Sequence, residues 1–284
     1  MTLPGTRSRV VDVRSRAVLP GSVVDEAELD KMLGKGLRAL TARPTTPEAW
    51  RQILGEARSI VLKFNSVGAS VLGTSAPMAR VLVQSLVEAG YDRRQLSLVE
   101  APDHIYNELR MRPPVQSWGD TIPVGGRNEP LAAYVYEADA IINVPFFKTH
   151  HIAGMSGAMK NLSHALIRHP ALYHGNGCSP FVAQVIGHKV VSVKVRLNIA
   201  NALRVVIDGG PEASDGNVHD HGGLVLGYDP VAVDATGLGI ITTYRAQRNL
   251  PQPLGVPYLA SAAQMNVGRL EAHSLEQLVV DAAC

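Results

Sequence analysis

One segment of the chain concentrates side chains that could bind an anion and move a proton. It begins with Lys148, ends with Lys160, and contains His150 and His151 followed by the turn Gly-Met-Ser-Gly. Lysines attract anions, glycines let a ligand approach the backbone closely, and histidine exchanges a proton near neutral pH. We therefore predict that this segment acts on a small anionic substrate, with His150, His151 and Lys160 as catalytic residues.

Further polar residues follow strands of the expected fold, where parallel sheets place their ligands. Lys63 and Asn65 come at the end of one apolar run, and Asp208 comes at the end of another. A helix that begins after the Gly-x-x-Gly turn would add free backbone N–H groups at its first turn. The residues predicted to bind the anion are Lys63, Asn65, Lys148, Gly154, Ser156, Gly157, Asn161, His174 and Asp208.

A metal-dependent enzyme is the main alternative. His219, Asp220 and His221 follow one another, and alternate residues of an extended segment face the same way. In the first interpretation there is no metal. In the alternative the metal would be held by His150, His151, His219 and His221, with His169, His174, Asp215 and Asp220 as further candidates. We expect His164 to lie on a helix surface and Cys178 to be an incidental thiol in a Gly- and Pro-rich loop.

The composition excludes several classes of protein. The formal net charge is only +2, with arginines scattered along the chain, which argues against a nucleic-acid partner. No apolar run is long enough to span a bilayer, and the N-terminus lacks the apolar stretch of a signal peptide, so we expect no membrane partner and a cytoplasmic location. The 2 cysteines are too few for an iron–sulfur cluster, which takes four thiolates; the cofactor otherwise stays open.

The elements that must position these residues alternate along the chain. Short apolar runs predict strands at residues 9–20, 59–64, 96–100, 138–144, 203–207 and 223–227. Amphipathic runs predict helices at residues 25–40, 46–57, 77–89, 103–110, 158–168, 179–196, 229–244, 257–264 and 275–282, with loops in the rest of 101–137. This order predicts an α/β fold, mainly a parallel sheet with helices on both faces, Rossmann-like, as a single domain or a domain with two lobes.

Four runs carry a family resemblance in their order and spacing: Ala138–His151, Gly154–Leu162, Val206–Gly210 and Gly223–Ala235. They resemble the family called domain of unknown function 362. The resemblance covers roughly residues 55–245 and implies an α/β fold in a bacterial or archaeal enzyme of mostly unknown activity. Some members of that family carry a ferredoxin-like part with cysteine motifs, and this sequence lacks those cysteines. We accordingly divide the chain into an N-terminal strand and helices, residues 1–57, and a core, residues 58–284.

A more distant resemblance is to lactate racemase-like proteins. The run from His150 to Lys160 looks like their His…Gly-x-Ser-Gly-Gly-x-Lys segment, in which the lysine anchors a nickel-pincer nucleotide. By this motif Lys160 would match the anchor, and His150 or His151 the base. The sequence departs from the motif at Ala158, where those proteins have a second glycine. We retain from this resemblance the anion-facing His/Lys loop and not the nickel.

These patterns lead to three functional hypotheses. The first is a lyase- or isomerase-like enzyme that performs an elimination, cyclisation or isomerisation, in which a histidine base and lysines act on a small anion. The second is the metal-dependent enzyme described above. The third is a non-catalytic subunit of a biosynthetic complex, for which residues 1–57 outside the resemblance would supply a surface. A homodimer is compatible with all three.

Overall fold

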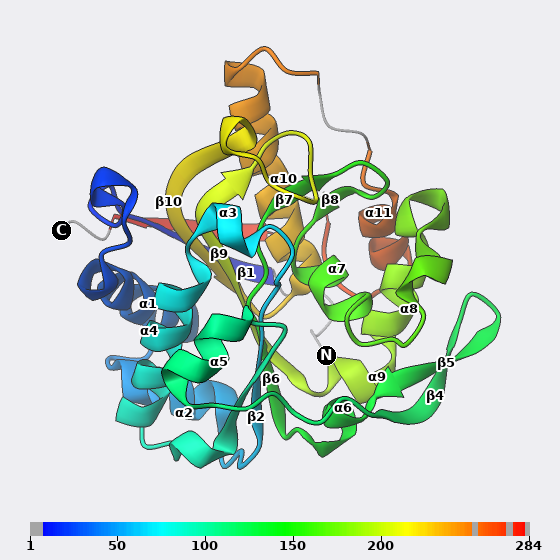
Figure 1. The fold of residues 1–284 in the computed structure, drawn as a ribbon, viewed down its shortest axis with the longest axis horizontal. Coiled ribbons are helices and arrows are strands. Elements are labelled where there is room, and N and C mark those ends of the chain that lie inside the picture. The colour runs from blue at the N-terminus through cyan, green and yellow to red at the C-terminus, as the bar shows by residue number, and fades with distance from the viewer. Residues whose placement is uncertain (1–7, 252–254, 271–274, 282–284) are drawn as a thin grey trace.

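The computed structural model describes residues 8–251, 255–270 and 275–281. Nine described strands form one central sheet. They are β1 (Ser8–Arg14), β2 (Ile60–Lys63), β3 (Leu96–Val99), β6 (Ala140–Asn143), β7 (Lys148–His150), β8 (Gly154–Ser156), β9 (Val195–Val206), β10 (Val218–Gly227) and β11 (Leu275–Asp281). Their order is β11-β1-β10-β9-β6-β2-β3, with β7 paired to β8 and β9 (Figure 1).

The sheet is mainly parallel. Strands β9, β6, β2 and β3 run in one direction, and β1 and β11 share it. Only β10 and β8 run against it among the described strands. A mainly parallel sheet with helices on its faces confirms the fold class predicted from the alternation of strand and helix patterns.

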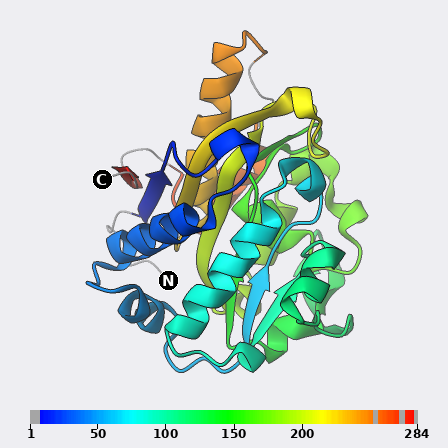
Figure 2. The same cartoon turned by 60° about the vertical axis from the view of Figure 1, so that its left-hand side comes forward.

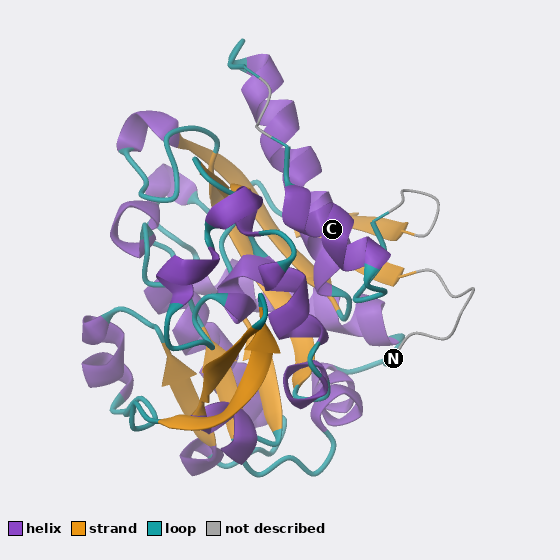
Figure 3. Cartoon of the chain, turned by 90° about the vertical axis from the view of Figure 1, so that its right-hand side faces the viewer, coloured by secondary structure: helices purple, strands orange, loops and turns teal. Residues whose placement is uncertain are grey.

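Helices cover both faces of the sheet (Figure 3). The side chains of Ile60 and Leu62 join one apolar cluster, whereas Val61 between them joins another, as expected when successive residues of a strand face opposite ways. The first cluster also holds residues of α1 (Glu26–Thr41), α2 (Thr46–Leu54), α4 (Ser75–Glu88) and α5 (Asp103–Leu109), of which the blue and cyan helices stand in front in Figure 2. The opposite face is covered by α6 (Ala133–Glu137), α7 (Ala158–Ser163), α8 (Phe181–Gly187), α9 (Lys189–Ser192), α10 (Pro230–Gln247) and α11 (Pro257–Gln264).

Sequence signals explain where several helices begin. Asp25 caps α1 by accepting from the N–H of Glu28, and Thr45 with Glu48 forms a capping box at α2. Asp229 accepts from two N–H groups in the first turn of α10, and Pro230 takes the first position, which needs no donor. These starts lie within one residue of the predicted ones.

Several predicted elements differ in the structure. The helix predicted at 275–282 is a strand in its described part: residues 275–281 form β11, because parallel pairing with β1 overrides a leucine spacing that suits a helix. The loops predicted within 101–137 include a hairpin of β4 (Trp118–Val124) and β5 (Arg127–Ala132). Prolines at positions 123 and 130 interrupt its alternating pattern. The strand predicted at 203–207 corresponds to the last residues of the long strand β9, which ends at Val206. The helix predicted at 179–196 is instead two short helices, α8 and α9, of which the second ends at Ser192.

The register of the parallel strands places polar residues side by side at one end of the sheet. Lys63 of β2 is opposite Asn143 of β6, and Asn143 is opposite Asn198 of β9. The short helix α3 (Ala69–Leu72) lies near this end of the sheet and packs on Phe146. The chain therefore brings its candidate residues to the carboxyl ends of β2 and β6. Among the described residues, no helix has the length and apolar character that crossing a bilayer requires.

Candidate active site

A chain of buried amide side chains crosses the ends of these strands. Asn143 Nδ2 donates to Asn198 Oδ1 at 2.9 Å and to Ala158 O at 3.0 Å. Asn161 of α7 donates to Asn143 Oδ1 at 2.7 Å, and its own Oδ1 accepts from Asn65 Nδ2 at 3.0 Å. All four distances are those of ordinary hydrogen bonds. The network therefore ties α7 and the loop after β2 to the sheet.

The ammonium group of Lys63 uses all three of its donors within the protein. Nζ donates to Phe64 O at 2.6 Å, to Glu100 Oε2 at 3.0 Å and to Asn161 Oδ1 at 3.1 Å. Burial lowers the pKa of Lys63, while the nearby Glu100 carboxylate favours its charged form. Since a lysine has three donors and no acceptor, Lys63 positions Asn161 and has no donor left for a ligand.

Lys148 and Lys160 are buried lysines that pair with no carboxylate in the described part of the chain. Lys148 Nζ donates to Val67 O at 2.6 Å and to Asn65 Oδ1 at 3.3 Å, and Lys160 Nζ lies 3.4 Å from His174 Nε2. Burial, and next the charge of Lys160, lower the pKa of Lys148 to about 8. Neighbouring buried cations favour an anion that supplies the missing negative charge.

Hydrogen bonds fix opposite tautomers in His150 and His151. His150 Nδ1 accepts from the N–H groups of Ile152 and Ala153, both at 3.2 Å, so the proton of the neutral ring is on Nε2. His151 Nδ1 lies 3.2 Å from the Gly210 carbonyl oxygen, which can only accept. Its proton is therefore on Nδ1 and its Nε2 is bare. The two rings stack with centroids 5.1 Å apart, so a donor and a proton acceptor stand side by side.

The first turn of α7 is already occupied by a carboxylate. Asp234 of α10 accepts from the N–H of Ala158 and, at 3.1 Å, from that of Met159. A Cβ at Gly157 would lie 2.2 Å from Asp234 Oδ1, so the glycine makes room for this internal anion. The prediction that these helix amides are free to bind a ligand is corrected at Ala158 and Met159. Burial raises the pKa of Asp234 to about 7, despite its backbone hydrogen bonds.

The remaining predicted anion ligands lie in different surroundings. Gly154 and Ser156 begin and end β8, where Gly154 pairs with His150 and Ser156 pairs with Lys148 of β7. Asp208 instead forms an ion pair with Arg245 Nη1 at 2.7 Å. A cation therefore already neutralises Asp208, and its side chain is not part of the lysine cluster.

The structure does not gather the four histidines of the metal alternative. His219 stacks on Tyr244 with ring centroids 3.7 Å apart, and His221 Nδ1 lies 2.9 Å from the Tyr244 hydroxyl. Both contacts are on the β10 side of α10, whereas His150 and His151 stack on each other. Within the described ranges, one group of at least three close metal-ligating side chains is found, and it consists of His164, His174 and Cys178.

Sequence reasoning did not include Asn143, Asn198, Glu100 or Asp234 in the site. Asn143 ends the otherwise apolar strand β6, and this is the signal that could have found it, whereas Asn198 is one of several polar residues of β9. Asp234 lies in an ordinary helical pattern, and Glu100 is one polar residue at a strand end. Only the fold brings these two carboxylates to α7 and Lys63.

Open cavities lie elsewhere on the molecule. One of about 480 Å³ is lined by residues that include Arg110 and Arg112, and one of about 500 Å³ is lined by residues that include Arg14 and His221. Lys148 and Lys160, by contrast, are only 1% and 8% exposed. The lysine cluster is therefore closed in this conformation.

No curated protein matches the chain significantly. Two solved structures are similar to the chain. One is the lactate racemase apoprotein from Thermoanaerobacterium thermosaccharolyticum, at 11% identity and a TM-score of 0.47. The other is a Thermotoga maritima protein from a structural genomics consortium, at 12% identity and a TM-score of 0.46. Each alignment covers 85% of this chain and 59% of the other. Residues 111–239 match the model of the family described as Domain of unknown function (DUF362), which confirms the resemblance seen in the sequence over these residues.

Proposed function

We propose that the protein is an enzyme that binds a small anion beside Lys148 and Lys160 and exchanges a proton with it through His151. The observation that carries this proposal is the pair of opposite tautomers beside two lysines without carboxylate partners. The bare Nε2 of His151 can take a proton from the substrate. The Nε2–H of His150 can donate to negative charge that develops elsewhere on it. An isomerisation, elimination or cyclisation would use both the proton acceptor on His151 and the donor on His150.

The charge of the lysines affects the protonation of the neighbouring histidines. Burial, and next the charge of Lys160, lower the pKa of His150 to about 3, so its ring is neutral when no anion is bound. A bound anion would offset the lysine charge and make a proton on the histidines more stable. Binding the substrate would therefore prepare the site for proton transfer.

Access requires the loop after β2 to move. Lys148 holds this loop through the carbonyl of Val67, an exposed residue. An anion that replaces this carbonyl would gain a charge-assisted hydrogen bond and would release the loop. We expect the enzyme to act in the cytoplasm on a free small molecule rather than on nucleic acid or a membrane.

The test has a binding part and an exchange part. Sulfate, phosphate and a panel of small carboxylates are titrated by calorimetry, and the exchange of carbon-bound hydrogen of the carboxylates is followed by ¹H NMR in D₂O. Lys148→Met should weaken anion binding by about 10-fold or more, since a hydrogen bond to a charged group contributes about 1.5–3 kcal/mol. His151→Gln should slow the exchange by about 10²-fold or more.

Matched variants separate these effects from general damage. Lys189→Met and His104→Gln change an exposed lysine and an exposed histidine outside the site and should behave as wild type. Binding of none of the anions, or exchange by His151→Gln at the wild-type rate, would show that the proposal is wrong.

A further inference from the structure

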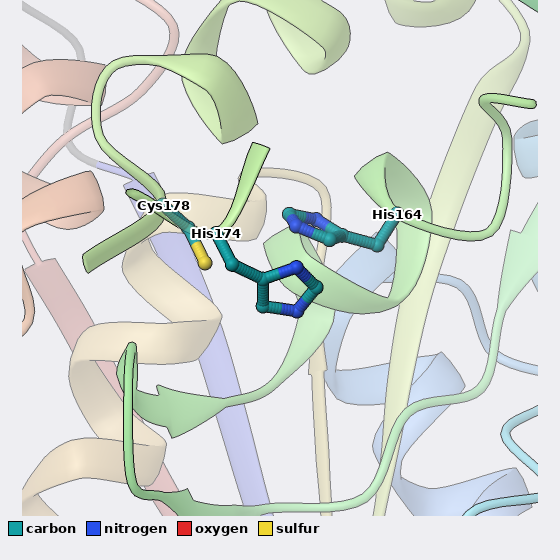
Figure 4. Close-up of side chains that lie close together, drawn as sticks. All are labelled: His164, His174 and Cys178. Carbon is teal, nitrogen blue, oxygen red and sulfur yellow. The ribbon is translucent and has the colours of Figure 1, made fainter. Parts of the chain in front are cut away.

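His164, His174 and Cys178 bring three possible metal-ligand atoms together beside the lysine cluster. One donor atom of each residue lies within 4.8 Å of the donor atoms of the other two. His164 directly follows α7, whereas His174 and Cys178 come from the short 3-10 turn η4 (Gly175–Cys178) and the residue before it. Figure 4 shows the sulfur and both rings directed toward a common space. The cysteine is buried and the histidines are half-buried.

Neighbouring oxygen atoms leave the Nε2 of His164 without a proton. The Ser163 hydroxyl has one proton, which it donates to Lys160 O at 3.3 Å. With that proton on Lys160 O, Ser163 Oγ accepts at its 3.0 Å contact with His164 Nδ1, and the ring proton is then on Nδ1. His164 Nε2 is then bare, and it is a buried atom without a hydrogen-bond partner. A buried, unpartnered nitrogen lone pair is costly unless it binds something.

The Nε2 of His174 is also left without a proton. Its Nδ1 lies 3.1 Å from the carbonyl oxygen of Pro170, so Nδ1 donates and Nε2 is bare. Metal-binding histidines characteristically use one ring nitrogen for the ion and donate the other N–H to an oxygen, which fixes the tautomer. Both histidines of this cluster meet that requirement, although the two oxygen acceptors differ.

We propose that His164 Nε2, His174 Nε2 and the thiolate of Cys178 form a binding site for a Zn²⁺ ion. Imidazole nitrogen and thiolate are the ligands that this ion prefers, and three protein ligands leave its fourth position for water or another exchangeable ligand. Binding is balanced as Zn²⁺ plus the Cys178 thiol giving a zinc–thiolate bond and one released proton. Zinc–ligand bonds of about 2.0–2.3 Å require the three donor atoms, which lie within 4.8 Å of one another, to move closer together.

Lys160 competes with the ion for one of these ligands. Its Nζ lies 3.4 Å from His174 Nε2, so the lysine and a metal ion use the same lone pair. Removing the lysine charge should therefore strengthen zinc binding while it weakens anion binding. The zinc site does not rest on the proposed proton transfer, because neither Cys178 nor His164 takes part in it.

The experiment uses the full chain without a histidine tag, after treatment with a chelator. Zn²⁺ is titrated by competition with a chromophoric chelator, and Co²⁺ is used as a spectroscopic substitute. We expect one ion per chain and, with Co²⁺, a thiolate-to-metal charge-transfer band. Cys178→Ser and His164→Ala should each weaken binding by about 10-fold or more, the lower range of losses seen when only an outer-shell partner is removed. Lys160→Met should bind zinc more tightly than wild type.

Controls distinguish this site from adventitious binding. Cys284→Ser changes the other cysteine of the chain, and His169→Ala changes a histidine held by Glu129; both should bind zinc as wild type does. Zinc binding that survives Cys178→Ser, or no stoichiometric binding, would overturn the proposal. If Cys178→Ser does not fold, the wild-type Co²⁺ spectrum decides, since absorption without the thiolate band also overturns it. In either case sulfate binding to wild type and to Lys148→Met is measured separately and tests the anion site.

Discussion

The carboxylate of Asp234 stands where a side chain at position 157 would have to be. A Cβ built on Gly157 comes within 2.2 Å of Asp234 Oδ1, and the same carboxylate accepts from the first N–H groups of α7. Asp234 thus caps, from a distant helix, the helix that carries Lys160. The glycine that looked like an opening for a ligand is a contact between α7 and α10.

Gly157→Ala should therefore destabilise the protein by about 1–3 kcal/mol, the usual cost of overpacking a closed site. Urea unfolding measures this change. Gly239→Ala is the matched control, because a Cβ at Gly239 of α10 meets no atom within 4 Å. Alanine in a helix is favoured over glycine by about 0.5–1 kcal/mol, so the control should gain stability. Equal effects of the two substitutions would contradict the role of Asp234.

Asn143→Leu should break the amide network at its centre. The substitution leaves Asn161 Nδ2, Asn198 Oδ1 and Ala158 O without the partner that Asn143 provides. Each buried group that loses its partner costs about 1–3 kcal/mol, so we expect a large loss of stability. Thermal and urea unfolding measure it. Asn107→Leu, on the exposed face of α5, should stay within about 0.5 kcal/mol of wild type. A stable Asn143→Leu variant would mean that the network is dispensable.

Lys148 should give anion binding and stability opposite dependences on pH. Its pKa is lowered by burial to about 8, so the charge that holds an anion is lost as the pH rises through 8. Sulfate affinity should fall between pH 7 and pH 9. Over the window from about 8 to the ordinary lysine pKa of about 10.4, the unfolded state binds more protons, so this group adds stability as the pH rises.

Calorimetry at several pH values and urea unfolding at the same values check this prediction. In Lys148→Met both pH dependences should shrink, whereas Lys189→Met should keep them, since Lys189 is exposed. Sulfate affinity that stays constant from pH 7 to pH 9 would argue against Lys148 as the anion ligand.

The two neighbouring histidines should be distinguishable by NMR. His150 accepts at Nδ1 from two N–H groups, and His151 faces a carbonyl oxygen with Nδ1. Long-range ¹H–¹⁵N correlation spectra should therefore show an unprotonated Nδ1 in His150 and an unprotonated Nε2 in His151. Spectra of His150→Gln and His151→Gln assign the signals. The same tautomer in both rings would remove the acid–base pairing on which the proposed function depends.

Local patterns predicted the parts of the fold that depend on neighbouring residues. The caps at Asp25 and Asp229 and the buried runs of β2, β3 and β6 are readable because their signals lie within one element. β11 was missed because its strand conformation depends on pairing with β1, more than 250 residues earlier in the chain. Distance in sequence, rather than weak propensity, limits such predictions.

The same limit applies to the candidate site. Lys148, His150, His151 and Lys160 were found because they are close in the sequence, and Lys63 and Asn65 because they follow a strand. Their individual roles depend on partners that the sequence does not reveal. The three donors of Lys63 are used by Phe64 O, Glu100 and Asn161, and the tautomer of His151 depends on Gly210. Residue types therefore predicted that these groups lie near one another, but not which partner each of them has.

The place of β1 in the sheet has a consequence for synthesis of the protein. β1 is the first described strand, yet its partners are β10 and β11, the last two strands. A ribosome that adds about 5–20 residues per second needs about 10–40 s to make the chain between β1 and β10. Throughout that time a strand with the apolar residues Val10, Val11 and Val13 has no partner in its own sheet. During translation this unpaired apolar segment is one that a chaperone can cover.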